Sequence, residues 1–420
     1  MRIQFLGKVA LSALLISPLF PTSAVAQTEA PTKVVGFNEQ VFNLPVEEAD
    51  AFIYLYRNMT LGDQENYTPD YYLKVIRKSL DAKKANQFAT TEPEAIWLEY
   101  VLSPRVADEG LDNFRSYYFD DLQEATANKD RAGAIAAVKN WVAQNVDIDE
   151  DATAGLTPMN VVRCNVARPR EAAITLVTAY RTVGIPARLT GNYVEVYNGG
   201  NWEKQALSPT PKDKKNRSRL MHYGEKLCEV NDAELATRYG EESAPRVAAM
   251  LKRARGNWQA ITDFLDAVPR ERLQEAISMA EMLSDLSLQS TPARILTNTV
   301  NFTTQQPVDE IYLKYVLNPE IGSIPVTDYR RRMRLKHATS NQSVDDIKAY
   351  IRDRVETVAD ASRFPEPVYP TQLWKQRRGD KKSVNIYFVA ACRNNGIPAR
   401  LDANGSAEYY EGGSWHNAGL

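Results

Sequence analysis

The stretch that decides the fold runs from Pro158 to Trp202 and reads PMNVVRCNVARPREAAITLVTAYRTVGIPARLTGNYVEVYNGGNW. A second version, PTQLWKQRRGDKKSVNIYFVAACRNNGIPAR, occupies Pro370–Arg400. The two versions align without a gap over Pro158–Arg188, 10 of the 31 positions are identical, and both end in Gly-Ile-Pro-Ala-Arg. An internal repeat of this kind indicates that the chain is a tandem duplication.

Each copy predicts a buried helix that leads into a β-hairpin. The apolar spacing of three to four residues defines one helix face, which carries Ala173, Leu176, Val177 and Tyr180 in the first copy and Asn385, Phe388, Val389 and Cys392 in the second. Gly184 and Gly396 stand where a helix C-cap needs a left-handed residue. Alternation over Tyr193–Tyr197 predicts a strand, and Gly199-Gly200 predicts the hairpin that places Trp202 on the return strand.

This helix, turn and hairpin resemble the core of transglutaminase-like proteins, which have a papain-like fold. In that family a Cys begins the helix, a His lies on the next strand, and an Asp or Asn lies on the strand after. A helix N-terminus and an imidazolium both stabilise a thiolate, and the third group fixes the imidazole tautomer. The resemblance implies an α+β fold of two tandem transglutaminase-like domains. Each would have a helical N-terminal part and a small antiparallel sheet packed on the signature helix, which precedes Gly-Ile-Pro-Ala-Arg.

The same resemblance implies that both copies have lost the catalytic triad. Counting back from Gly184 to the nucleophile position reaches Pro169, and the same count from Gly396 reaches Lys381. The His position of the first copy falls on Gly191, and the acid expected after Trp202 is missing from Ala206-Leu207-Ser208-Pro209. The second copy has Asn404-Gly405-Ser406-Ala407 and His416-Asn417-Ala418 in the two regions. We therefore expect no catalytic residue, no cofactor and no metal.

The vacated clefts still offer side chains that could bind a ligand. Candidates for a binding cleft are Arg168, Glu171, Tyr193, Trp202, Lys381 and Trp415. Each also has a simpler interpretation: Pro169 suits the first turn of a helix, Lys381 is an exposed lysine, and the aromatic residues pack on the sheet.

The chain has only three cysteines, Cys164, Cys228 and Cys392. Cys392 lies on the expected buried helix face, where it would act as a small hydrophobic residue. A Cys164–Cys228 disulfide remains open, and the odd count leaves at least one free thiol. Cys164 lies five residues before Pro169, so it could serve as a displaced nucleophile only if its loop folded back.

The N-terminus predicts export. Residues 1–26 combine Arg2 and Lys8, an apolar run from Val9 to Ile16, and Ala24-Val25-Ala26 as a cleavage site. No Cys stands at that site, so we expect no lipid anchor, and no other apolar run is long enough to span a bilayer. Removal of Arg2 and Lys8 takes the net charge from −2 to −4, which argues against nucleic acid as a partner. We expect a periplasmic or extracellular protein.

Helical patterns precede both copies of the stretch. They appear at Ala51–Met59, Tyr71–Ala85, Glu94–Val106, Asn231–Leu288 and Glu310–Pro319, and the last resembles Glu94–Pro104. The first segments also resemble the N-terminal helical extension of some secreted bacterial transglutaminase-like proteins. Two loops are expected: Thr210–Arg219, which is charged and contains Pro211, and Thr291–Pro307, which is rich in Thr, Asn and Gln and lacks a clear period. The expected domains are 36–215 and 216–420, and the second is either truncated or completes its sheet with a partner's strand.

Three functions remain open at this stage. The first is a secreted, non-catalytic binding or scaffold module for polypeptide or cell-envelope polymer, an inference by analogy with the fold. The second is a thiol enzyme that transamidates or cleaves peptide bonds through Cys164. The third is a structural component of a larger assembly. The sequence does not predict the ligand or the oligomeric state.

Overall fold

The computed structural model describes residues 43–207, 232–303, 307–337 and 342–420, and Leu44–Leu420 form one compact unit. The expected signal peptide at 1–26 and the expected loop Thr210–Arg219 lie outside the described residues, as does Cys228.

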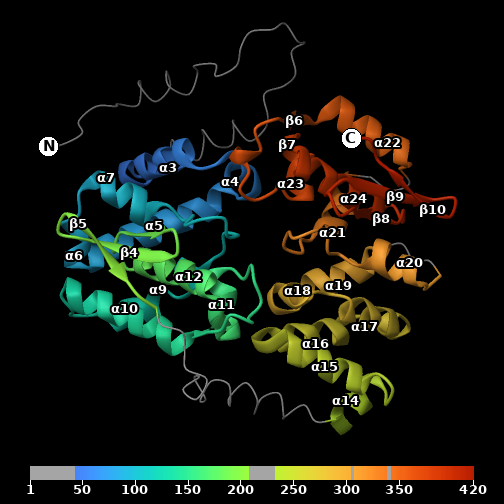
Figure 1. Ribbon diagram of the computed structural model, residues 1–420, viewed down its shortest axis with the longest axis horizontal. Helices are drawn as coiled ribbons and strands as arrows, with labels where there is room; N and C mark the ends of the chain where they lie inside the picture. The colour runs from blue at the N-terminus through green and yellow to red at the C-terminus, as the bar shows by residue number, and fades with distance from the viewer. Residues whose placement is uncertain (1–42, 208–231, 304–306, 338–341) are drawn as a thin grey trace, which may run out of the picture. The chain divides into compact units, whose positions relative to one another are not determined.

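The first copy is a set of helices followed by a small sheet (Figure 1). Its elements are α3 (Val46–Asn58), α4 (Leu61–Asn66), α5 (Pro69–Ala85), α6 (Gln87–Thr90), α7 (Glu94–Trp97), the π-helix η1 (Leu98–Leu102), α8 (Phe114–Tyr117), α9 (Phe119–Thr126), α10 (Arg131–Asn145), β1 (Asp147–Ile148), α11 (Pro158–Cys164), β2 (Val166–Ala167), α12 (Pro169–Thr182), β3 (Ala187–Thr190), β4 (Tyr193–Asn198) and β5 (Asn201–Gln205).

The second copy follows a similar order (Figure 1). Among the described residues, it has more helices before its π-helix, two helices instead of three between the π-helix and its first strand, and an added 3-10 turn before α23. Its elements are α14 (Asp232–Tyr239), α15 (Ala244–Ala254), η2 (Arg255–Asn257), α16 (Trp258–Ala267), η3 (Arg270–Arg272), α17 (Leu273–Glu281), α18 (Asp285–Ser290), α19 (Ala293–Asn301), α20 (Glu310–Tyr312), the π-helix η4 (Leu313–Leu317), α21 (Tyr329–His337), α22 (Val344–Arg354), β6 (Glu356–Val358), η5 (Ala361–Arg363), α23 (Pro370–Gln376), β7 (Arg378–Asp380), α24 (Lys381–Asn394), β8 (Ala399–Leu401), β9 (Ala407–Glu411) and β10 (Ser414–Asn417).

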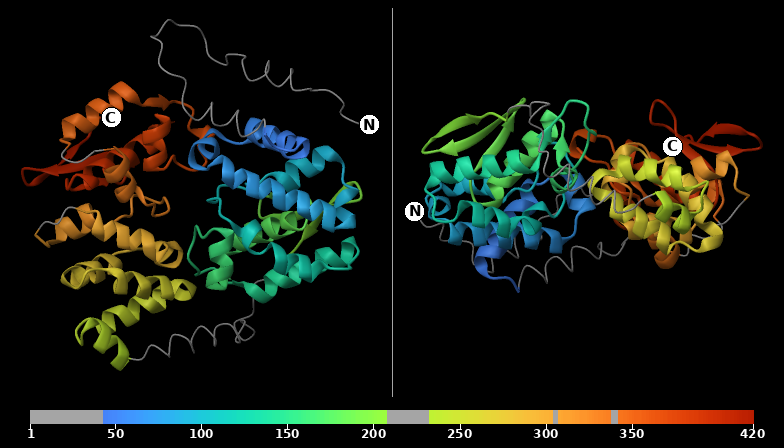
Figure 2. Two further views of the ribbon diagram at one scale, coloured as in Figure 1. Left: turned by 180° about the vertical axis from the view of Figure 1, so that it is seen from behind. Right: turned by 90° about the horizontal axis from the view of Figure 1, so that it is seen from below.

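The signature helices α12 and α24 each pack against an antiparallel three-stranded sheet (Figure 2). The strand order is β3-β4-β5 in the first copy and β8-β9-β10 in the second. In the first copy Val194 and Val196 point from the sheet into the core. The helix faces expected from the sequence are buried in both copies, so this prediction is confirmed.

The ends of the signature helices follow from local sequence. Pro169 occupies the first turn of α12, where its missing N–H leaves no hydrogen bond unmade. Asp380 caps α24, and its carboxylate accepts from Ser383 N at 2.9 Å. Gly184 and Gly396 have φ values of +87° and +77°, as the C-cap prediction requires.

Two predicted boundaries are wrong. The expected loop at Thr291–Pro307 contains the helix α19, because Leu296 and Val300 are four residues apart and both are fully buried. Tertiary packing here overrides the low helix propensity of the Thr and Asn residues around them. The helix expected over Glu94–Val106 ends at Leu102, where the π-turn η1 leads into an extended segment.

Buried arginines hold the irregular segments in both copies. In the first copy Arg181 donates to the carbonyl oxygens of Ala187, Ser103 and Arg105, and Arg115 donates to those of Val101 and Leu102. In the second copy Arg393 donates to the carbonyl oxygens of Ala399, Asn318 and Glu320, and Arg330 donates to those of Val316 and Leu317. The last carbonyl groups of each π-helix have no backbone N–H donor from a following helical turn. A guanidinium group donates hydrogen bonds to them instead.

The two copies dock on each other reciprocally. Helix α23 of the second copy contacts α4 of the first, where the Asn66 side chain donates to Pro367 O at 2.9 Å and accepts from Tyr369 N at 2.8 Å. Helix α11 of the first copy contacts η2 and α18 of the second, where Arg163 donates to Gln289 O at 3.0 Å. The helices α11 and α23 have the same position in the repeat, so each copy uses this helix in a contact with the other copy.

A buried charge cluster lies at the contact between α4 and the segment before α23. Arg105 binds Asp63 through two nitrogens, one of them at 2.7 Å, and its Nη2 lies 3.4 Å from Glu366 Oε2. The Glu366 carboxylate also accepts from the hydroxyl groups of Tyr67, at 2.7 Å, and Tyr369. Burial raises the pKa of Glu366 above its usual range, although these hydroxyls and Arg105 oppose the shift.

We predict that Gly256→Ala destabilises the protein. A Cβ on Gly256 would lie 2.0 Å from Arg163 O, so α11 and η2 would have to separate. The expected loss is about 1–3 kcal/mol in the free energy of unfolding by urea titration. Gly62→Ala, whose Cβ would lie 2.9 Å from Glu366 O, tests the other contact. Unchanged stability of both variants would contradict the reciprocal docking.

We also predict a pH dependence that Glu366 causes. The pKa of Glu366 is raised in the folded state, so the folded protein binds this proton more tightly than the unfolded chain does. The stabilisation that protonation gives is complete below the unfolded pKa. It is lost as pH rises through the folded pKa. Acidification from neutral pH to about pH 5 should therefore raise the melting temperature more in the wild type than in Glu366→Gln. An equal response of the two proteins in thermal melts would argue against this role of Glu366.

Candidate functional site

The N-terminus of α12 is where the resemblance places the nucleophile of the first copy. The residue there is Pro169, which is exposed and has no group that could act as a nucleophile. Arg168 donates from Nε to Ala152 O at 2.7 Å, and Glu171 Oε1 accepts from Gly155 N at 2.8 Å. Both side chains therefore hold the loop before α11 against the first turn of α12.

The N-terminus of α24 is the equivalent place in the second copy. Lys381 and Lys382 are exposed in its first turn, beside the capping Asp380. Ser383 Oγ donates to Asp380 and accepts from Val368 N at 2.8 Å, so the hydroxyl is engaged in the cap. The helix dipole opposes an ammonium group at a helix N-terminus and favours the Asp380 carboxylate at the N-cap.

The positions expected for a His and an acid carry small or apolar residues in the first copy. Gly191 lies in the turn between β3 and β4 with φ +59°, and a Cβ there would meet nothing within 4 Å. Ala206 and Leu207 line a cavity of about 250 Å³ together with Ala172, Val142 and Ile148. Lys139 is the one charged side chain among the described residues that line it. The space beside the first turns of α12 is therefore mainly apolar.

The aromatic candidates lie on the outer face of the sheets. In the first copy Trp202 packs edge-on against Tyr100 of η1 at 4.7 Å between ring centroids, and Arg188 lies 4.0 Å over the Trp202 ring while it binds Glu195 at 2.9 Å. Tyr193 is 57% exposed beside Lys204. Because Val194 and Val196 face α12, the residues that alternate with them face away from it.

The second copy repeats this cluster with the same geometry. Trp415 lies 4.7 Å from Tyr315, and Arg400 lies 4.0 Å over the Trp415 ring while it binds Glu408 at 2.8 Å. The interplanar angle of the Trp–Tyr pair is 73° in both copies. The cluster ties each hairpin to the π-helix before it, which is a packing role.

The structure therefore does not bring the six expected cleft residues together. Arg168 and Glu171 lie at the start of α12, Tyr193 and Trp202 lie on the outer face of the first sheet, and Lys381 and Trp415 belong to the second copy. A single cleft lined by all of them is not present in the described part of the chain.

Cys164, the expected alternative nucleophile, is a buried free thiol at the end of α11. Its Sγ lies 3.9 Å from Gln289 O, at the contact between the two copies. Burial raises the pKa of Cys164 to about 11, and Arg163 and Arg255 offset only part of the shift. At neutral pH this thiol is protonated, which opposes a nucleophilic role. Cys392 is also buried and free, and burial raises its pKa further.

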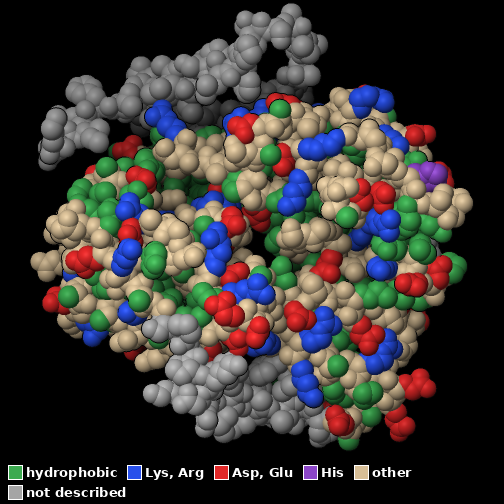
Figure 3. Space-filling model, viewed as in Figure 1, with side chains coloured by type: hydrophobic (Ala, Val, Ile, Leu, Met, Phe, Trp, Pro, Cys, Tyr) green, Lys and Arg blue, Asp and Glu red, His purple; other side chains and the backbone are tan. Residues whose placement is uncertain are grey.

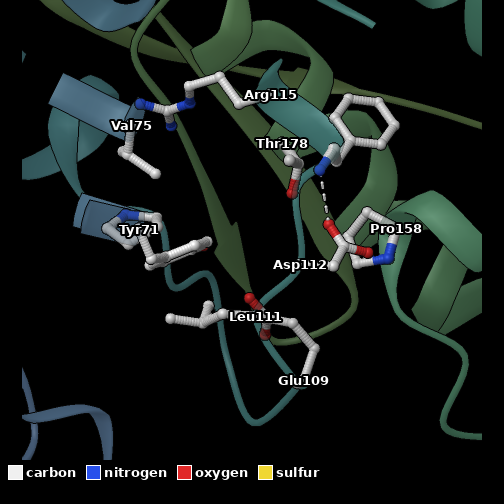
Figure 4. A pocket seen from close by; sticks show the side chains of 11 residues that line it. Tyr71, Val75, Glu109, Leu111, Asp112, Arg115, Pro158 and Thr178 are labelled. Carbon is white, nitrogen blue, oxygen red and sulfur yellow. Dashed lines mark hydrogen bonds between the residues drawn. The ribbon is translucent and has the colours of Figure 1, made fainter. Parts of the chain in front are cut away.

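Two carboxyl groups, those of Glu109 and Asp112, line a small cavity between α5, the segment 104–112 and α12 (Figure 4). Its volume of about 20 Å³ has room for about one water molecule. Asp112 accepts from Phe114 N at 2.8 Å and from Met159 N at 2.7 Å, which joins the loop to α11. Burial raises the pKa values of Glu109 and Asp112, while backbone N–H groups oppose the shift. This cavity is too small for a substrate.

Sequence reasoning missed the buried arginines and the charge cluster between the copies. The arginines had a detectable signal, because Arg181 and Arg393 stand three residues before Gly184 and Gly396 in the aligned repeats. The contact between Glu366 and Arg105 had no detectable signal in the sequence, since it joins residues that are 261 positions apart.

Charges of both signs are mixed over the face that Figure 3 shows. Among the described residues, no group of three or more His, Cys, Asp or Glu side chains could hold a metal ion. No helix in the described ranges has the length and apolar character needed to cross a membrane.

A comparison with protein families supports the resemblance stated from the sequence. The family model of the transglutaminase-like superfamily matches residues 120–216 and 327–416. These segments contain both signature helices and both sheets. The comparisons with curated proteins and with solved structures gave no match. The two segments together cover 187 of the 420 residues, so the chain is similar to this superfamily in two segments and not over most of its length.

Proposed function

We propose that this protein is an exported, non-catalytic member of the transglutaminase-like group that binds polypeptide or cell-envelope polymer. The observation that carries the proposal is the pair of residues at the helix N-termini, Pro169 and Lys381, where acyl transfer through this fold would need a thiolate. The turn at Gly191 and the apolar surroundings of Ala206 support it further.

The competing thiol-enzyme hypothesis depends on Cys164. A catalytic cysteine needs a lowered pKa and access to a substrate. Cys164 has a raised pKa and is buried against Gln289. His416 is exposed at the hairpin of the second sheet, where its Nε2 lies 3.0 Å from Ser414 Oγ. These observations favour binding over catalysis.

The structural-component hypothesis differs from the binding hypothesis in its partner. A purely structural subunit would co-purify with one protein and show no thermal shift with small ligands. A binding module should show a raised melting temperature with at least one of three probes: peptidoglycan fragments, glycans or peptides.

We predict that the purified protein does not accelerate the transfer of a fluorescent amine to the glutamine residues of β-casein. The rate should equal the background rate of a reaction from which this protein is omitted. Cys164→Ala should leave this background rate unchanged, because the thiol is not a nucleophile in the fold. Gel fluorescence against an active transglutaminase measures both rates. Transfer by the wild type that the Cys164→Ala substitution abolishes would overturn the proposal and establish the thiol enzyme.

A further inference from the structure

A cavity of about 500 Å³ lies in the first copy between α3, the start of α4, α5 and the segment after η1. This volume is in the range of ligand sites. The apolar part of its wall includes Leu55, Met59 and Tyr72. Leu55 and Tyr72 are 3% exposed, so this wall is a fixed part of the core. None of the described lining residues belongs to α12 or to the sheet.

The cavity contains one carboxylate that is held in an ion pair and one that belongs to no ion pair between described residues. Asp63 is bound by Arg105 through two nitrogens, which cancels its charge. Glu99 projects from η1, is exposed, and belongs to none of the ion pairs between described residues. The cavity therefore presents a negative charge beside an apolar wall.

Tyr54 lies beside Glu99 in this cavity. Burial, together with the charges of Glu99 and Tyr100, raises the pKa of Tyr54. The hydroxyl group therefore stays protonated at neutral pH and is neutral. Because Tyr54 also presents an aromatic ring, it can contact a cation as well as an aliphatic chain.

The second copy provides an internal comparison. In the aligned π-helices Lys314 stands at the position of Glu99, and Glu320 stands at the position of Arg105. Glu320 accepts from Ser284 N at 3.0 Å and from Ser284 Oγ at 2.5 Å, so it binds the residue that caps α18. The fold thus tolerates either sign of charge at both positions. The negative charge in the cavity of the first copy is therefore not a requirement of the fold.

We propose that this cavity binds a basic side chain of a polypeptide partner. The aliphatic stem would pack along Leu55 and Met59, and the charged group would bind the Glu99 carboxylate beside Tyr54. A cation suits the site because the charge that remains unneutralised is negative. The inference rests on the proposed binding function and specifies the chemistry of the ligand.

The test uses fluorescence anisotropy of a labelled peptide of alternating alanine and lysine with the full-length mature protein. The wild type should bind this peptide and should not bind the same peptide with every lysine acetylated. Glu99→Gln should weaken binding about tenfold or more, because it removes a charge-assisted hydrogen bond. Glu310→Gln removes the same charge from an exposed site on α20 of the second copy and should leave the affinity unchanged.

The possible outcomes distinguish failure of the proposed cation site from failure of the proposed binding function. Equal affinity of Glu99→Gln and the wild type would overturn the site and leave the binding function intact. Equal weakening by Glu310→Gln would show that only net charge matters and would also overturn the site. Equal binding of the acetylated peptide would overturn recognition of a cation. Binding of neither peptide would overturn this inference, and a thermal shift with glycans or peptidoglycan fragments would then preserve the proposed function.

Discussion

The structure depends on buried guanidinium groups that satisfy backbone carbonyl oxygens. Arg181 in the first copy and Arg393 in the second each join the signature helix to the following strand and to the segment after the π-helix. Burial lowers the pKa of both arginines, yet each has three carbonyl partners. A buried carbonyl without a donor costs about 1–3 kcal/mol, so removal of either arginine would leave several such groups unsatisfied. Neither of these arginines stands at a position where the family resemblance places a catalytic group, so the framework does not require one.

The sequence predicted those parts of the fold that local patterns determine. The buried faces of α12 and α24 follow from apolar spacing, and Gly184 and Gly396 follow from the need for positive φ. The helix α19 was missed because it has few apolar residues. Their spacing indicates a helix only once the core against which they pack is known. The return strand that carries Trp202 was predicted and is confirmed as β5, but the face on which Trp202 lies was not, since strand alternation alone does not tell which face of a sheet a neighbouring helix covers.

The two copies share a framework and differ in surface chemistry. Glu99 and Arg105 of the first copy correspond to Lys314 and Glu320 of the second. The Arg–Trp–Tyr–Glu cluster is kept in both, with the same Trp–Tyr and Arg–Trp distances. Interactions that hold the fold have therefore stayed the same, whereas charges at the cavity have been exchanged. Function in such a protein has to be inferred from individual sites, because the fold alone supports several functions.

The central claim is that neither copy retains thiol chemistry, and the reactivity of Cys164 tests it most directly. The rate of its alkylation by iodoacetamide can be followed against pH by peptide mass spectrometry, which separates Cys164 from Cys228 and Cys392. The account predicts slow alkylation at neutral pH and an apparent pKa of about 11 for Cys164. Rapid alkylation with an apparent pKa below the ordinary thiol value of about 8.5 would contradict it.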